Sequence, residues 1–295
     1  MRLWLLRAIW ITLPLSAGGA AAGAISTWND SPRVVAAVLL WLAWGAGTLT
    51  ILAPRPVGLT VLRVLAPAFV ALAVAAAIGG DVSTIDGAAA IGATLVAAVL
   101  VAGADIALAA ANAVAYGDER RFPLRTPPAL FLGLIPLARV LVATGVAAGP
   151  LLIADEHLIA GAVALLVGGP VVVMGGRSLH LLSRRWLVLV PAGVVVIDPM
   201  TLPDPVLFVR SQVRTLRAVN ADAPVPDRGV DLRLGATMGT VAMTFTEPTD
   251  LVRARRAPRG ATTITTSCLL VAVVRRQQFL DEAGQRRVRV VPRDV

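Results

Sequence analysis

Two ionisable residues, Asp105 and Arg139, lie inside long apolar runs, where charged groups can relay protons or ions. A charge in hydrocarbon costs about 3 kcal/mol on insertion scales, so it usually finds a partner or water. Asp105 is eleven residues before Tyr116, and Arg139 is eleven residues after Pro128. If a loop joins two antiparallel helices here, both groups lie about 16 Å from the membrane surface and can meet.

Three interpretations of these two charges stay open at this point. They form a structural ion pair that fixes helix packing, with Asn112 seven residues further along the Asp105 face. They form a proton or ion relay, which predicts a small transporter. In the third interpretation they do not pair, and the long Arg139 side chain reaches the cytoplasmic interface.

Other reactive side chains are few and scattered, which argues against an enzyme. His157 follows Asp155 and Glu156 directly, but one tripeptide does not make a metal site. Cys268 is the single cysteine, and it lies in a β-branched run typical of a packed strand. The sequence has no nucleophile elbow, no H-E-x-x-H and no P-loop. We therefore expect a non-enzymatic protein without cofactor or metal.

Arginine clusters near the C-terminus indicate a polyanionic partner. They comprise Arg253, Arg255, Arg256 and Arg259, and further along Arg275, Arg276, Arg286, Arg287 and Arg289. Each basic residue near an anionic leaflet adds about 1 kcal/mol of attraction, so the expected partners are lipid of the inner leaflet and a cytoplasmic or membrane protein. Nucleic acid is not expected, because no helix-turn-helix or zinc-ligand spacing occurs. The alternative is a solvated basic surface without a binding role.

The composition places these groups in a membrane protein with two parts. Of 295 residues, 57% are apolar and 15% are charged, and all 27 basic residues are arginine. A soluble protein is nearer half apolar and a quarter charged. Residues 1–176 contain 9 arginines and 8 acidic residues, whereas residues 177–295 contain 18 and 10. An almost uncharged apolar part is therefore followed by a basic one.

Six apolar runs are long enough to cross a bilayer, which takes about 20 residues. They lie near residues 4–26, 34–53, 57–79, 88–115, 130–153 and 157–176. The first run also resembles a cleavable signal peptide, because two arginines precede it and small residues end it. Gly19/Gly23 and Gly145/Gly149 have the small-xxx-small spacing of close helix packing, inside the chain or at the interface of a homo-oligomer.

The distribution of arginines between short loops predicts the orientation. With a cytoplasmic N-terminus, seven arginines fall on the inner side, and Arg33 alone falls in the outer loops. Positive residues favour the cytoplasmic side. We therefore expect a polytopic protein of the plasma (inner) membrane with both termini in the cytoplasm.

The C-terminal part has the short, β-branched runs of a mainly-β domain. Two such runs, 186–190 and 194–198, surround a Pro-Ala-Gly turn and predict a hairpin. Residues 248–260 are expected to form an exposed basic loop, and residues 275–284 a final helix. The predicted organisation is an α-helical membrane bundle over 1–178 and a cytoplasmic mainly-β domain over 179–295.

The opening hairpin, W-L-V-L-x-x-x-G-V-V-V-I, directly after a membrane helix resembles the bacterial pleckstrin-homology-like (PH-like) domain. The chain as a whole resembles polytopic membrane proteins of actinobacteria that carry such a domain. The resemblance implies a bent antiparallel sheet capped by a C-terminal helix, and it supplies no site residues. The expected function is to bind a partner protein or the inner leaflet. The alternative is a small-solute or ion transporter that uses the Asp105/Arg139 region.

Overall fold

The computed structural model describes the whole chain except residues 80, 222, 256–259 and 292–295. It divides into two compact units, one of Met1–Ala110 with Ile135–His180 and the other of Ala111–Leu134 with Leu181–Val295. The sequence analysis placed its boundary at residue 178. The structure differs by adding residues 111–134, from the middle of the apolar part, to the C-terminal unit.

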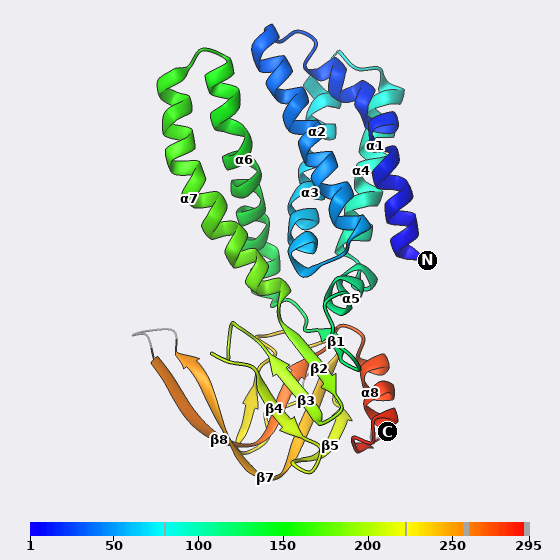
Figure 1. Ribbon diagram of the computed structural model, residues 1–295, viewed down its shortest axis with the longest axis vertical. Helices are drawn as coiled ribbons and strands as arrows, with labels where there is room; N and C mark the ends of the chain where they lie inside the picture. Colours follow the sequence, from blue (N-terminus) through cyan, green and yellow to red (C-terminus); the bar gives the residue numbers. More distant parts are fainter. Residues whose placement is uncertain (80, 222, 256–259, 292–295) are drawn as a thin grey trace. The chain divides into compact units, whose positions relative to one another are not determined.

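The first unit is a bundle of apolar helices (Figure 1). These are α1 (Arg2–Ala24), α2 (Asp30–Leu52), α3 (Pro56–Gly79), α4 (Thr84–Ala102), α6 (Ile135–Ala154) and α7 (Leu158–Ser183). Six segments of the described chain are long and apolar enough to cross a membrane, the fifth of them being Leu130–Ala154, which includes a π-helical turn at Leu130–Leu134. Each of the six predicted runs thus overlaps one of the six helices that could span a membrane, as expected of a polytopic membrane protein.

Small residues let these helices approach one another, while larger aliphatic side chains cover their outer surface. Ala20, Ala73 and Ala90 bring α1, α3 and α4 together in one buried cluster. A Cβ on Gly145 would lie 3.2 Å from the carbonyl oxygen of Gly168, so α6 and α7 pack backbone against backbone. The Gly145/Gly149 pattern therefore serves internal packing, because both glycines face α7.

The fourth predicted run, 88–115, is two helices. Helix α4 ends at Ala102, and the short helix α5 (Ala104–Asn112) begins after Gly103. Gly103 has φ −65° and ψ 147°, an extended conformation that interrupts the helical hydrogen bonds. The break changes the direction of the chain, so distances counted along one continuous helix do not apply beyond it.

The second unit contains two sheets and one helix (Figure 1). The first sheet has the order β1 (Arg120–Pro123), β2 (Trp186–Val190), β3 (Gly193–Ile197) and β4 (Val206–Val209), all antiparallel. The second has the order β6 (Gly229–Asp231), β8 (Gly260–Ala272), β7 (Thr240–Arg255), β5 (Val213–Ala218) and β9 (Val290–Val291). Helix α8 spans Arg276–Gln285. The predicted hairpin and final helix are confirmed, but the predicted basic loop is partly strand, since β7 continues to Arg255.

Aromatic contacts join the layers of this unit. Phe208 of the first sheet stacks on Phe245 of the second, with ring centroids 4.7 Å apart. Phe122 of β1 meets Phe279 of α8 edge to face at 5.3 Å. Phe122, Phe208 and Phe279 are at most 1% exposed, so these rings form the centre of the hydrophobic core.

Strand β1 comes from the connection between α5 and α6, and it joins both sheets. Phe122 pairs with Leu187 of β2 in antiparallel register. Two residues further on, Leu124 bridges to Val273, and the Arg125 amide donates to the carbonyl oxygen of Ala272 at 2.8 Å. A segment that the sequence analysis treated as a loop between spans is therefore part of the β-rich domain.

Candidate functional sites

Asp105 lies in the first turn of α5, where a carboxylate is favoured by the positive end of the helix dipole. Its Oδ2 forms an ion pair with Nη1 of Arg2, 3.1 Å away, at the start of α1. The side chains of Asp105 and Arg2 are 36% and 59% exposed, so the pair is not enclosed. The break at Gly103 explains this placement, because it removes Asp105 from the line of α4.

Arg139 of α6 forms no ion pair within the described residues, and its buried Nε has no hydrogen-bond partner there. The structure thus brings Asp105 to Arg2 and not to Arg139. The predicted contact between Asp105 and Arg139 is therefore not formed among the described residues.

Asn112 holds β1 in place. Its Nδ2 donates to the carbonyl oxygen of Arg121, and its Oδ1 accepts from the Arg121 amide, both at 2.9 Å. The amide side chain therefore satisfies both backbone groups of one β1 residue, as a neighbouring strand would. On the same strand, the Arg121 guanidinium lies 5.0 Å from the centre of the Trp186 ring. Asn112 consequently acts within the β-rich domain.

The most buried charges of the domain are Arg185 and Asp198, which the sequence analysis did not single out. The Arg185 Nε lies 2.7 Å from Oδ1 of Asp198, and an Nη–Oδ2 bond of 2.9 Å makes the pair bidentate. Their side chains are 2% and 0% exposed. Arg185 also donates to the carbonyl oxygens of Arg125 and Leu232, while Asp198 accepts from the Thr201 hydroxyl at 2.8 Å.

This buried pair connects three separate parts of the domain. Arg125 belongs to the segment after β1, Asp198 follows β3, and Leu232 follows β6. Each polar group of the pair has a partner, which is the condition for a buried ion pair to be tolerated. The available sequence signals were an arginine, the second of the pair Arg184 and Arg185, directly before an apolar strand, and an aspartate directly after the next strand. Neither signal identifies its partner.

The predicted basic residues do not form one loop. Arg253 and Arg255 lie in β7, opposite Thr262 and Gly260 of β8. Arg256 and Arg259 lie outside the described residues. Arg275 precedes α8 at its N-cap position, and Arg276 begins the helix and donates to the carbonyl oxygen of Val219 at 3.2 Å. The first group therefore follows an extended hairpin, and the second is tied to the body of the domain.

The remaining candidate reactive side chains are two histidines and one cysteine. No cluster of three or more His, Cys, Asp or Glu side chains is found in the described part of the chain. His157 Nδ1 contacts the backbone oxygen of Asp155 at 2.7 Å, and His180 Nδ1 lies 3.4 Å from the Thr60 hydroxyl. Cys268 is 3% exposed, and burial raises the pKa of its thiol, which disfavours the reactive thiolate.

Comparison of the chain with known protein families, curated proteins and solved structures gives no match. The arrangement of the described residues is therefore the basis for the function proposed below.

Proposed function

We propose that this is a non-enzymatic integral membrane protein of the plasma membrane, whose basic β-rich domain lies in the cytoplasm and binds the anionic inner leaflet. The observation that carries the proposal is the pairing of β1 with β2. It builds the domain from two segments that both continue into helices of the bundle. The domain is therefore tethered to the bundle by its own chain and does not need to be recruited.

The chain limits how far the domain can move from the bundle. Helix α7 ends at Ser183 and β2 begins at Trp186, a separation of at most about 10 Å. The β1 segment adds two further attachments, one from Asn112 and one to Leu130. Tethering on this scale raises the effective concentration of the domain at the surface, so weak electrostatic attraction suffices.

Several arginines of the domain are available to anionic headgroups. Arg210 and Arg214 are exposed, Arg253 is half-buried, and none of the three forms an ion pair within the described residues. Each of them that reaches an anionic leaflet contributes about 1 kcal/mol of attraction. By contrast, Arg120 and Arg286 both form ion pairs with Glu282, so their positive charge is partly neutralised.

The proposal includes a PH-like identity for the domain. It is supported by the order of elements: the antiparallel strands β2–β4, a second sheet containing β5, β7 and β8, and then α8. Strand β1, and the parallel additions β6 and β9, are features beyond that pattern.

The orientation is tested by reporter fusions. A reporter after Val295, or within residues 118–126, should be active in the cytoplasm, and one near Asp30 should be active outside. The reason is the excess of arginine in the loops on the proposed inner side. An external C-terminus would overturn the proposal at its first step.

Leaflet binding is tested with the full chain in nanodiscs. A fluorophore on Thr262→Cys, opposite Arg253 in the hairpin, reports energy transfer to labelled headgroups in a Cys268→Ala background. Transfer should be stronger with phosphatidylglycerol present than with phosphatidylcholine alone. It should weaken as salt shortens the Debye length from about 30 Å at 0.01 M to about 3 Å at 1 M.

Arg253→Gln should shift the docked fraction toward the free state by about fivefold, the equivalent of about 1 kcal/mol. The matched control is Arg33→Gln, which removes one arginine from the first turn of α2, on the proposed outer side. Equal transfer with neutral and anionic lipid, or no response to salt, would reject leaflet binding. A cytoplasmic or membrane protein would then be the partner to seek.

A further inference from the structure

Helices α1 and α2 touch closely at one point, and a cavity lies beyond it. At the contact, a Cβ on Gly47 would be 2.1 Å from the Trp10 ring, so a larger residue does not fit. Trp10 Nε1 donates to the carbonyl oxygen of Trp44 at 3.1 Å, and Trp44 Nε1 donates to that of Trp10 at 2.8 Å. These paired bonds hold the two helices together on one side of the cavity.

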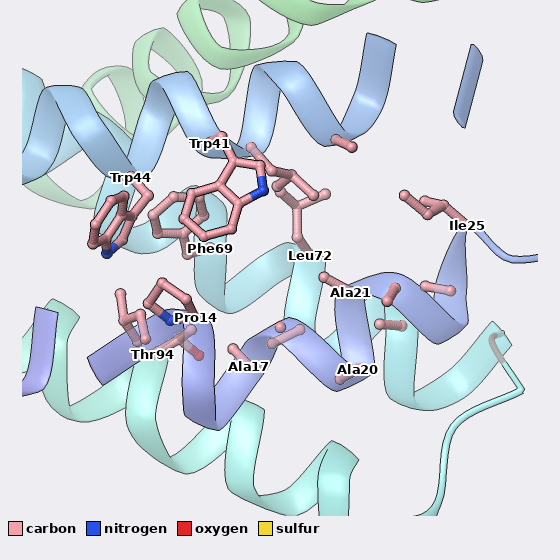
Figure 2. Close-up of a pocket in the computed structure, with 18 residues that line it drawn as sticks. Pro14, Ala17, Ala20, Ala21, Ile25, Trp41, Trp44, Phe69, Leu72 and Thr94 are labelled. Atoms are coloured by element: carbon pink, nitrogen blue, oxygen red, sulfur yellow. The ribbon is translucent and has the colours of Figure 1, made fainter. Parts of the chain in front are cut away.

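The cavity has a volume of about 470 Å³ and is walled by α1, α2 and α3, with Thr94 of α4 at its base. Figure 2 shows Trp41 and Leu72 on one side and the short side chains of Ala17, Ala20 and Ala21 on the other. The space exists because methyl groups on α1 face large rings across it. Such short side chains do not reach far enough to fill it.

Two polar groups of the cavity wall already form hydrogen bonds within the protein and are not available to a polar ligand. The Thr94 hydroxyl donates to the carbonyl oxygen of Ala90 at 2.7 Å, and the Trp44 indole is bound to Trp10. The remaining lining is aliphatic or aromatic carbon, apart from the Trp41 indole N–H. A sugar, amino acid or ion would lose its hydration here without compensation, so the chemistry selects hydrocarbon.

The cavity opens on the surface of the bundle that faces lipid. Trp41 is 58% exposed and Leu72 is 52% exposed, although both line the cavity. Both residues lie within helices α2 and α3, well inside segments long enough to span the bilayer. The medium at the opening is therefore the acyl-chain region of the bilayer.

The size of the cavity distinguishes between the two kinds of apolar occupant that a membrane offers, a transmembrane helix and a lipid acyl chain. The lining residues of α1 run from Leu13 to Ile25, about 18 Å at 1.5 Å per residue, so the cavity is long and has a mean cross-section of about 26 Å². A helix about 10 Å in diameter has a cross-section of about 79 Å², so the groove is too narrow to take a transmembrane helix of another copy or protein. We propose that this cleft between α1 and α2 binds one acyl chain of a membrane lipid.

The test uses the full chain in bilayers that contain a phospholipid with a photoreactive diazirine in the middle of one acyl chain. Cross-links should concentrate on residues 13–25 of α1 and 37–44 of α2, compared with other lipid-facing surfaces such as α7. Gly18→Leu should remove these cross-links by filling the cleft. Gly18 lines the cavity, and a Cβ there meets nothing within 4 Å, so the substitution fits.

The matched control is Gly19→Leu. Gly19 is the next residue of the same helix, is exposed, does not line the cavity, and also has nothing within 4 Å of an added Cβ. Both substitutions raise helix propensity equally, so cross-linking should differ between them while thermal stability is similar. If Gly18→Leu does not fold, Ala17→Leu provides the same obstruction from the preceding position.

Equal cross-linking of the two variants, or cross-links spread evenly over all exposed helix faces, would overturn the proposal. Protein–protein cross-links at residues 13–25, obtained with a photoreactive side chain there, would show a second copy in the cleft and overturn it as well. The cleft and the β-rich domain are tested by separate variants. Failure of leaflet binding therefore leaves this proposal intact, and the reverse also holds.

Discussion

Replacing Arg185 by methionine should strongly destabilise the β-rich domain. The change keeps most of the side-chain length but removes the bidentate bond to Asp198 and the bonds to the carbonyl oxygens of Arg125 and Leu232. It leaves a carboxylate that is 0% exposed without its cation. Removing one partner of a buried ion pair costs about 3–5 kcal/mol of the free energy of unfolding.

This loss predicts a large shift in the thermal midpoint of the domain. A unit of this size loses about 4 °C for each kcal/mol, so the midpoint should fall by roughly 15 °C. Pulsed maleimide labelling of Cys268 in mild detergent measures this midpoint. The single cysteine is 3% exposed in the folded domain, so it reacts only after the domain unfolds. The label therefore reports unfolding of this unit and not of the helix bundle.

Two further variants make the reasoning refutable. Arg184→Met changes an exposed neighbour and should alter the free energy of unfolding by less than about 0.5 kcal/mol. Arg185→Met combined with Asp198→Leu should recover much of the loss, because both buried charges are then absent. A loss below about 1 kcal/mol for Arg185→Met, or a double variant that loses the sum of the single losses, would refute the assigned role of the pair.

Three more outcomes follow from the same unit. Asn112→Ala removes both side-chain hydrogen bonds to the Arg121 backbone. It should therefore lower the free energy of unfolding by about 1–3 kcal/mol and speed amide hydrogen exchange in β1. Unchanged exchange in β1 would contradict the anchoring role of Asn112. Burial raises the pKa of the Cys268 thiol, and the nearby charge of Arg217 partly opposes this. The resulting stabilisation is complete below the unfolded-state pKa of about 8.5 and is lost as pH rises through the folded pKa. Above about pH 8.5, the free energy of urea unfolding of Cys268→Ala should therefore change less with pH than that of the natural chain. Equal changes with pH in the two proteins would argue against burial of the thiol. Residues 181–295 expressed alone should unfold readily, because β2 loses its edge partner, and joining 111–134 to them through a flexible linker should restore cooperative unfolding by the same assay.

The local pattern of the sequence was sufficient for those elements that depend on neighbouring residues. Six apolar runs of membrane-spanning length became six helices, since a helix satisfies its own backbone hydrogen bonds. The β2–β3 hairpin was also predictable from local sequence, because two β-branched runs and a Pro-Ala-Gly turn are adjacent in the chain. The Gly145/Gly149 spacing indicated close helix packing, but it did not identify α7 as the partner.

The tertiary structure decided what depends on partners distant in sequence. Strand β1 is only four residues long and includes Pro123, so its local signal is weak; it forms because Phe122 is buried against Phe279 of α8, more than a hundred residues later. The depth assigned to Asp105 assumed one straight helix, and the turn at Gly103 places it beside Arg2 instead.

Charge partnership shows the same limit. A sequence reports that arginines and acids are present, but a buried cation is stabilised only by the groups that the fold brings within about 3 Å of it. Arg185 has such groups from three segments of the domain, whereas Arg139 has no ion-pair partner among the described residues. The residue types thus determined that charges had to be accommodated in an apolar chain, and the contacts between distant segments decided which of them are buried and paired.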